Sequence, residues 1–149
     1  KSKEVLGNAM VASILNNDVD SFKSLLLPKD VALKFQYTND LDNSDQEVRD
    51  SFMAKHEATY DHKVIPRYEK NFQEMVALNK ANNLNWSHLN FIILYKAASK
   101  GEEYIPFFIH TKLKNSGYKH FYFDAVRYKG EWYLSGNMEI TKDEKYALK

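Results

Sequence analysis

The chain has 149 residues, which is the length of one ordinary domain and enough for a substantial hydrophobic core. Its 21 basic residues nearly balance its 20 acidic residues, which gives a net charge of +1. This balance argues against a protein that binds the phosphate backbone of a nucleic acid. There is no cysteine, which excludes disulfides, cysteine-ligated zinc and thiol nucleophiles. A transmembrane helix needs about 18 consecutive apolar residues, and no stretch of the sequence approaches that length. We therefore expect no membrane span and no nucleic-acid partner.

The sequence begins with Lys1-Ser2-Lys3 rather than with Met. This start fits an exported protein whose signal has been removed, and it fits equally a chain trimmed at its N-terminus. Export to the periplasm or the cell surface is therefore one hypothesis for its localisation, and the compartment stays open.

Two short helices are predicted at the start of the chain. Residues 4–16 place apolar side chains at helical spacing, and Asn16-Asn17 is a stop signal. Asp18 can then cap a second helix over residues 19–27, which Pro28 ends. Residues 31–38 alternate loosely between apolar and polar side chains, so we expect a short strand there, with a helical turn as the alternative.

A long helical region follows an acidic loop at residues 39–43. Ser44 and Glu47 have the spacing of a capping box, which predicts that a helix starts at Ser44. Helical spacing continues to Asn82-Asn83, but Pro66 lacks a backbone donor and clashes with the turn before it. We therefore expect a break or kink near Val64. No linker or repeat interrupts the chain, and we predict a single domain spanning residues 1–149.

The aromatic C-terminal third predicts an antiparallel meander. β-Branched and aromatic residues dominate residues 89–97, 102–114, 118–128 and 131–137. Asn115-Ser116-Gly117 and Lys129-Gly130 are hairpin signals between the last three segments. Because such strands must be covered on at least one face, the predicted fold class is α+β, with the N-terminal helices packed on a C-terminal antiparallel sheet.

The two hairpin loops determine which side chains share a face of this sheet. A three-residue loop at 115–117 and a two-residue turn at 129–130 place Ile109 opposite Phe123. The first face should be apolar and pack on the helices; it consists of Ile105, Phe107, Ile109, Phe121, Phe123, Ala125, Trp132 and Leu134. The second face is rich in tyrosine and should face solvent, a pocket or a subunit interface; it consists of Tyr104, Phe108, His110, Tyr122, Asp124, Val126, Tyr133 and Ser135.

The second face carries the candidate catalytic residues Asp124, His110 and Tyr122. A carboxylate between aromatic side chains has a raised pKa and can act as a general base, while Tyr122 or His110 would stabilise an enolate as a donor. The alternative, which we favour, is a structural polar group bonded to its cross-strand neighbours. For a bound ligand, the predicted contacts are Tyr104, Phe108, Tyr122, Tyr133 and Ser135.

Other polar clusters carry weaker signals. His56, Asp61 and His62 lack the i, i+4 histidine spacing of a zinc-binding helix, so we expect a solvated polar helix and no metal. The sequence contains no glycine-rich phosphate loop and no nucleophile elbow, so we expect no cofactor. The densest basic group surrounds one predicted hairpin and is interpreted as a solubilised sheet edge; it consists of Lys112, Lys114, Lys119 and His120.

Two segments give the chain a family resemblance. Residues 16–28 (NNDVDSFKSLLLP) place a short helix after the first, and residues 121–137 (FYFDAVRYKGEWYLSGN) give a strand, a Lys-Gly turn and a Trp-containing strand. In these features the chain resembles the nuclear transport factor two-like fold of the cystatin-like group. The resemblance implies a strongly curved sheet that closes as a cone around the helices. Members of that group include isomerases, dehydratases, polyketide cyclases and non-catalytic binding domains, so the fold alone assigns no activity.

The sequence supports three functional hypotheses. The first is a non-catalytic domain that binds a small apolar or aromatic ligand, or a partner, and forms a homodimer through its sheet. The second is an isomerase, dehydratase or cyclase that uses Asp124 as its general base. The third is a purely structural domain of an exported protein. The direction of the Asp124 carboxylate separates the first two, because an enzyme of this kind needs it in a closed, partly apolar cavity between sheet and helices.

Overall fold

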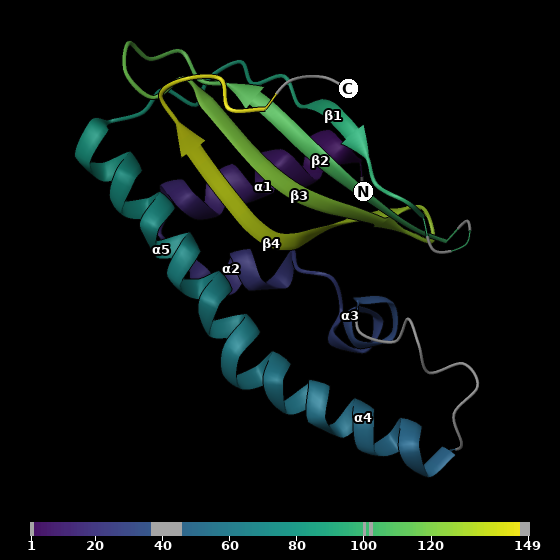
Figure 1. The fold of residues 1–149 in the computed structure, drawn as a ribbon. Coiled ribbons are helices and arrows are strands. Elements are labelled where there is room, and N and C mark those ends of the chain that lie inside the picture. The colour runs from purple at the N-terminus through teal and green to yellow at the C-terminus, as the bar shows by residue number, and fades with distance from the viewer. Residues whose placement is uncertain (1, 37–45, 100, 102, 147–149) are drawn as a thin grey trace.

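The computed structural model describes residues 2–36, 46–99, 101 and 103–146. Helices precede a single antiparallel sheet, which confirms the predicted α+β class and the order of elements (Figure 1). The helices are α1 (Lys3–Leu15), α2 (Val19–Ser24), α3 (Lys29–Gln36), α4 (Gln46–Thr59) and α5 (Ile65–Asn82), with the π-helical turn η1 (Tyr60–Val64) before α5. The strands are β1 (Ile92–Lys96), β2 (Tyr104–Lys112), β3 (His120–Tyr128) and β4 (Glu131–Thr141), paired in the order β1-β2-β3-β4.

The first two helices start where the apolar spacing predicts them. Helix α2 ends at Ser24 and not at residue 27, because Leu25 and Leu27 bond to Leu134 of β4. The Asp18 side chain accepts a hydrogen bond from the Ser21 N–H, which satisfies a donor that the start of α2 leaves free. The predicted Asp18 cap is thus confirmed. Phe22 of α2 stacks on Phe72 of α5 with ring centroids 4.7 Å apart, and this contact holds the short helix against the long one.

Helix α3 shows that the strand expected over residues 31–38 is wrong. The Ala32 N–H bonds to the Pro28 carbonyl (2.9 Å), Asp30 lies in the first helical turn, and Lys34 lies in the last. Charges in these positions stabilise a helix because they complement its dipole. The loose alternation is compatible with both structures, and the helical alternative is the one that forms. Residues 37 and 38 lie outside the described part of the chain.

Helix α4, η1 and α5 form one continuous helical segment (Figure 1). The disturbance predicted near Val64 is a π-helical turn and not a break, because the Ile65 N–H bonds to the carbonyl of Tyr60, five residues back. This wider turn accommodates Pro66, which lacks an N–H and displaces the backbone before it. Asn83 ends α5 in the left-handed conformation, as the predicted stop signal implies.

Helix α4 extends past the sheet and has no buried residue among those described (Figure 1). Lys29 of α3 connects it to the body through ion pairs with Glu57 and with Asp61 of η1, each 2.9 Å long. The predicted capping residue Ser44 lies outside the described residues, and α4 is described from Gln46. Within the described ranges, no helix has both the length and the apolar character that crossing a membrane requires.

The sheet has the register that the hairpin loops predict. Ile109 pairs with Phe123, and the β3–β4 turn has positive φ at both Lys129 (49°) and Gly130 (82°), as a two-residue type I′ turn requires. The apolar first face packs on α1, α2 and α5 and forms the main core, as expected. The sheet is curved but unclosed, so the cone implied by the resemblance is not completed (Figure 1).

Strand β4 is longer than the predicted segment 131–137 and carries a bulge at Gly136. Ala125 of β3 pairs with Leu134, whereas Phe123 pairs with Met138. Four residue steps along β4 therefore span two steps along β3, and the additional backbone bends the strand there.

Gly136 allows α5 to approach β4 closely. Its φ is 123°, and a Cβ at this position would lie 2.5 Å from the ring of Tyr68. Nearby, the Asn71 amide donates to the Met138 carbonyl (3.0 Å) and accepts from the Met138 N–H (2.8 Å). The edge of β4 is thus bonded to α5 and not open to another strand at this point.

Candidate functional site

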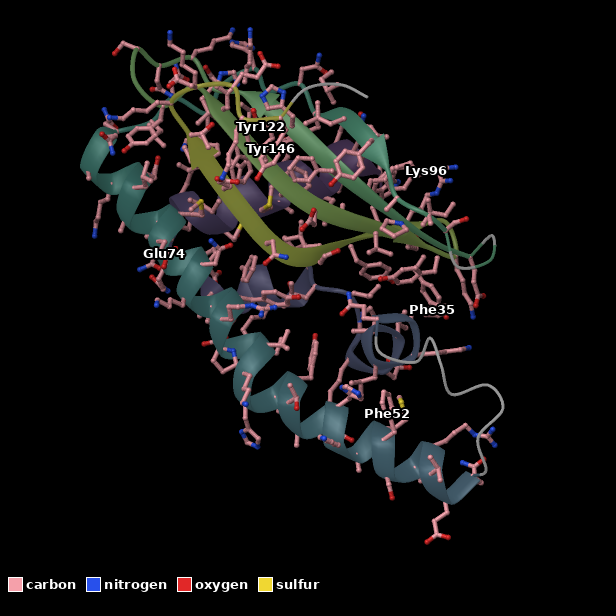
Figure 2. All side chains as sticks on the ribbon, in the orientation of Figure 1. Phe35, Phe52, Glu74, Lys96, Tyr122 and Tyr146 are labelled. Carbon is pink, nitrogen blue, oxygen red and sulfur yellow. The ribbon has the colours of Figure 1, made fainter. Side chains whose placement is uncertain are left out.

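The second face of the sheet is covered at two ends. At one end, Phe35 of α3 stacks on Tyr104 with ring centroids 4.7 Å apart. At the other end, Tyr146 from the segment after β4 packs edge-on against Phe108 and Tyr122, at 4.9 Å from each ring (Figure 2). The face predicted to meet solvent, a pocket or a subunit is therefore partly occupied by the chain itself.

Hydrogen bonds also hold the segment after β4 on this face. The Lys145 N–H donates to the Tyr122 hydroxyl (3.1 Å), and the Tyr146 hydroxyl donates to the Glu139 carboxylate (3.0 Å). Tyr122 is only 1% exposed beneath this segment. The predicted donor Tyr122 thus already has a backbone partner in the C-terminal segment.

Asp124 lies on the second face, opposite Phe108 in β2. Burial raises the pKa of Asp124, and a hydrogen bond of 3.3 Å from the Asn137 amide to its carboxylate opposes that shift. The residue lines two open hollows of about 150 and 240 Å³. Neither is the closed cavity between sheet and helices that the enzyme hypothesis requires.

The five predicted ligand contacts are not gathered around one hollow. Phe108 lines both hollows beside Asp124, Tyr122 lines the smaller one, and Tyr104 and Ser135 line the larger one. Tyr133 packs against the main core. The structure therefore brings Phe108, Tyr122 and Asp124 together and places Tyr133 elsewhere.

His110 lies two residue pairs along the sheet from Asp124 and has different partners. Its Nε2 shares a 3.0 Å hydrogen bond with Nδ1 of His120, and its ring stacks on Tyr122 with centroids 4.7 Å apart. Burial lowers the pKa of His110, His120 and Lys112 lower it further, and Glu144 opposes them. His110 therefore favours its neutral form, in which it can share a hydrogen bond with His120 without charge repulsion.

His110 also lines an open pocket of about 470 Å³, which we call the β1-edge pocket. Its lining surface is mostly apolar, and its volume lies in the range of about 300–1,000 Å³ that is typical of small-molecule sites. Apolar side chains come from Ile92 and Leu94 of β1 and from Leu113. Ionisable side chains also line it: His88, His110, Lys112, Lys114 and Glu144.

A bulge in β1 shapes this pocket. Ile93 pairs with Ile109 and Tyr95 pairs with Phe108, so Leu94 is an additional residue between two consecutive pairs. Leu94 is buried, yet it does not belong to the main core. It instead lines the pocket together with its neighbour on the strand, Ile92.

Sequence reasoning identified His110 but missed the pocket. The apolar residues of β1 are visible in the sequence, but the connection at 97–103 is too long to determine the register of β1 by hairpin parity. The basic group at Lys112 and Lys114 was a usable signal. It was assigned to a solubilised edge because its apolar neighbours could not be placed.

The polar cluster on the long helix forms ion pairs. Glu57 and Asp61 both bind Lys29, as described above, while His62 is exposed. Across the described residues, no three His, Cys, Asp or Glu side chains come together as ligands for a metal ion.

Comparisons of the chain with protein-family models, with curated proteins and with solved structures found no match in any of the three.

Proposed function

We propose that this protein is a non-catalytic domain that binds a small apolar or aromatic ligand in the β1-edge pocket. The observation that carries the proposal is the pocket itself: about 470 Å³, mostly apolar, and walled by Ile92, Leu94 and His110. Concave apolar surfaces with a few polar groups are the usual form of small-molecule sites.

The non-catalytic part of the proposal rests on how the candidate catalytic groups are engaged. His110 is bonded to His120, the Tyr122 hydroxyl accepts from a backbone N–H, and Asp124 accepts from Asn137. An acid–base mechanism needs these groups to converge on one site where a reacting atom can lie. Here His110 lines a different pocket from Asp124, and the two hollows beside Asp124, one of which Tyr122 also lines, are small and open.

The proposal is tested by titrating isotope-labelled protein with small apolar probes such as indole and octanol while recording amide and methyl NMR spectra. We expect saturable shifts centred on Ile92, Leu94 and Leu113. Ile92→Asp should remove them, because it places a charge against the apolar wall. Ile92 is 39% exposed, so this variant should remain folded.

A matched control is Val5→Asp, which introduces the same charge at an exposed apolar residue of α1. This variant should bind the probes as the parent does. Absence of saturable shifts in the parent protein would contradict the proposal and favour the purely structural hypothesis.

The resemblance to the nuclear transport factor two-like fold belongs to the same proposal. It is supported by the succession of helices followed by a curved antiparallel meander, with the Lys129-Gly130 turn before the Trp132 strand. Dimerisation through the sheet stays a prediction. The side chain of Ile92 on β1 is exposed, and sedimentation of the parent and of Ile92→Asp would test it.

A further inference from the structure

We infer that the ligand of the β1-edge pocket is an organic anion: an apolar body that carries a carboxylate-type head. This inference rests on the proposed function and specifies the chemical class of the ligand. It is carried by the distribution of charge around the apolar wall, where cationic side chains outnumber acidic ones.

The cationic side chains are two lysines at the end of β2 and just beyond it. Ile92 pairs with His110, and Lys112 lies two residues further along β2, so alternation along the strand places Lys112 on the same face as His110. Lys114 lines the pocket just past the end of β2, and His88 lines it from the segment that leads into β1. Among the described residues that line the pocket, Glu144 is the one with an acidic side chain.

Neither Lys112 nor Lys114 forms an ion pair within the part of the chain that the structure describes. Lys29 and Lys145, by contrast, each have a carboxylate within ion-pair distance. Two ammonium groups beside a concave apolar surface produce a positive potential that attracts an anion and repels a cation. A carboxylate can accept charge-assisted hydrogen bonds from both of them.

The apolar wall indicates that the part of the ligand beyond its charged head is a hydrocarbon. Ile92 is partly exposed and Leu94 is buried, and both line the pocket, so it offers a hydrocarbon surface together with the lysines. Inorganic phosphate would leave this surface in contact with water, and a neutral hydrocarbon would leave the lysines without a partner. An amphiphilic anion satisfies both.

The test uses three probes with the same alkyl chain and different heads: octanoate, octanol and octylammonium. Calorimetry or NMR titration at pH 8 should show that octanoate binds about fivefold more tightly than octanol, and that octylammonium binds most weakly; this is the scale expected for solvent-accessible ion pairs. Added salt should reduce the advantage of octanoate over octanol, because salt screens the attraction between solvent-accessible charges.

The double variant Lys112→Gln/Lys114→Gln should lower octanoate affinity to that of octanol and leave octanol binding unchanged. The matched control is Lys70→Gln/Lys80→Gln, which changes the net charge equally at two exposed positions on α5. The control should retain the preference for octanoate.

The outcomes separate this inference from the proposed function. Equal binding of octanoate and octanol, or tightest binding of octylammonium, overturns the anion inference and leaves the ligand-binding proposal standing. Loss of the octanoate preference in the control variant also overturns it, because net charge and not the pocket would then be responsible. Absence of binding by all three probes overturns the proposed function itself.

Discussion

The two faces of the sheet differ in what covers them. The first face is packed by α1, α2 and α5 into one continuous core. The second face is covered by Phe35 at one end and by Tyr146 at the other, and it keeps hollows and a pocket beside these contacts. Both faces are aromatic, so aromatic content alone does not distinguish a core from a binding surface. What distinguishes them is that three helices pack along the first face, whereas parts of the second face stay open between the side chains that cover its ends.

The largest expected difference between the faces comes from truncating one phenylalanine on each. Phe123 on the first face is 1% exposed and contacts Phe91 and Phe121, so Phe123→Ala should lower the free energy of unfolding by about 3–5 kcal/mol. Phe108 on the second face is half-buried, and Phe108→Ala should lower the free energy of unfolding by about 1 kcal/mol. Urea denaturation measures both, and similar losses would contradict the distinction drawn between the faces.

The second prediction concerns the close approach of α5 to β4 on the first face. Gly136→Ala places a Cβ at a residue with positive φ and against the ring of Tyr68. It should lower the free energy of unfolding by about 2–3 kcal/mol. Gly130→Ala is the control, since Gly130 also has a positive φ but no neighbouring atom within 4 Å of its Cβ position. It should cost only about 1 kcal/mol. If thermal unfolding ranks the two variants equally, the ring contact does not constrain this bulge.

A smaller effect of opposite sign is expected at Thr111, a fully buried polar residue on the first face. Its hydroxyl has no hydrogen-bond partner among the described residues, so Thr111→Val should raise the free energy of unfolding by about 1 kcal/mol. Thr141→Val removes a hydroxyl that donates to the Asp143 carbonyl (2.7 Å) and should be destabilising. Denaturant midpoints of the two variants should therefore shift in opposite directions.

The smallest expected effect is a pH dependence of the free energy of unfolding that arises from His110 on the second face. Because the pKa of His110 is lowered in the folded state, the unfolded state binds more protons as the pH falls below the ordinary histidine value of about 6.5. The free energy of unfolding should therefore decrease between about pH 7 and pH 5. His110→Phe preserves the stacking on Tyr122 and should flatten this decrease. The same experiment on His62→Asn, a change at an exposed residue of η1, should give a curve parallel to that of the parent.

The sheet register was predictable from the two hairpin signals, although only the turn at 129–130 is as short as predicted. The connection between β2 and β3 runs over residues 113–119, yet it keeps the register that a three-residue loop at 115–117 gives. A two-residue and a three-residue loop leave a single pairing that keeps Ile109, Phe123 and Ala125 on one apolar face. The end of α2 was predicted three residues too late, because Leu25 and Leu27 form backbone hydrogen bonds with Leu134 of β4 instead of continuing the helix. The disturbance at Pro66 was predictable, because proline acts on the backbone within one turn of its own position. The effect of this proline is local, and local sequence determines it.

The parts that were not predicted depend on contacts distant in sequence. Helix α3 is short, and its alternating pattern does not reveal that Phe35 will pack on Tyr104. Ser135-Gly136-Asn137 resembles a turn, so the predicted strand ended there, although Met138 and Ile140 continue the apolar alternation of Trp132. The β1-edge pocket required the register of β1 and its bulge, which no short loop determines.

The bulge in β4 also determines which changes of chain length the protein can tolerate. Side chains alternate between faces with a period of two, and the bulge adds two residues, so Trp132 and Leu134 before it share the core face with Met138 and Ile140 after it. Deleting Ser135 alone would turn every later side chain of β4 to the opposite face, moving Met138 toward the C-terminal segment and Glu139 into the core. Deleting Ser135 and Gly136 together would straighten the strand and leave each side chain on its present face. At this point in the fold, insertions and deletions should therefore be tolerated only in even numbers.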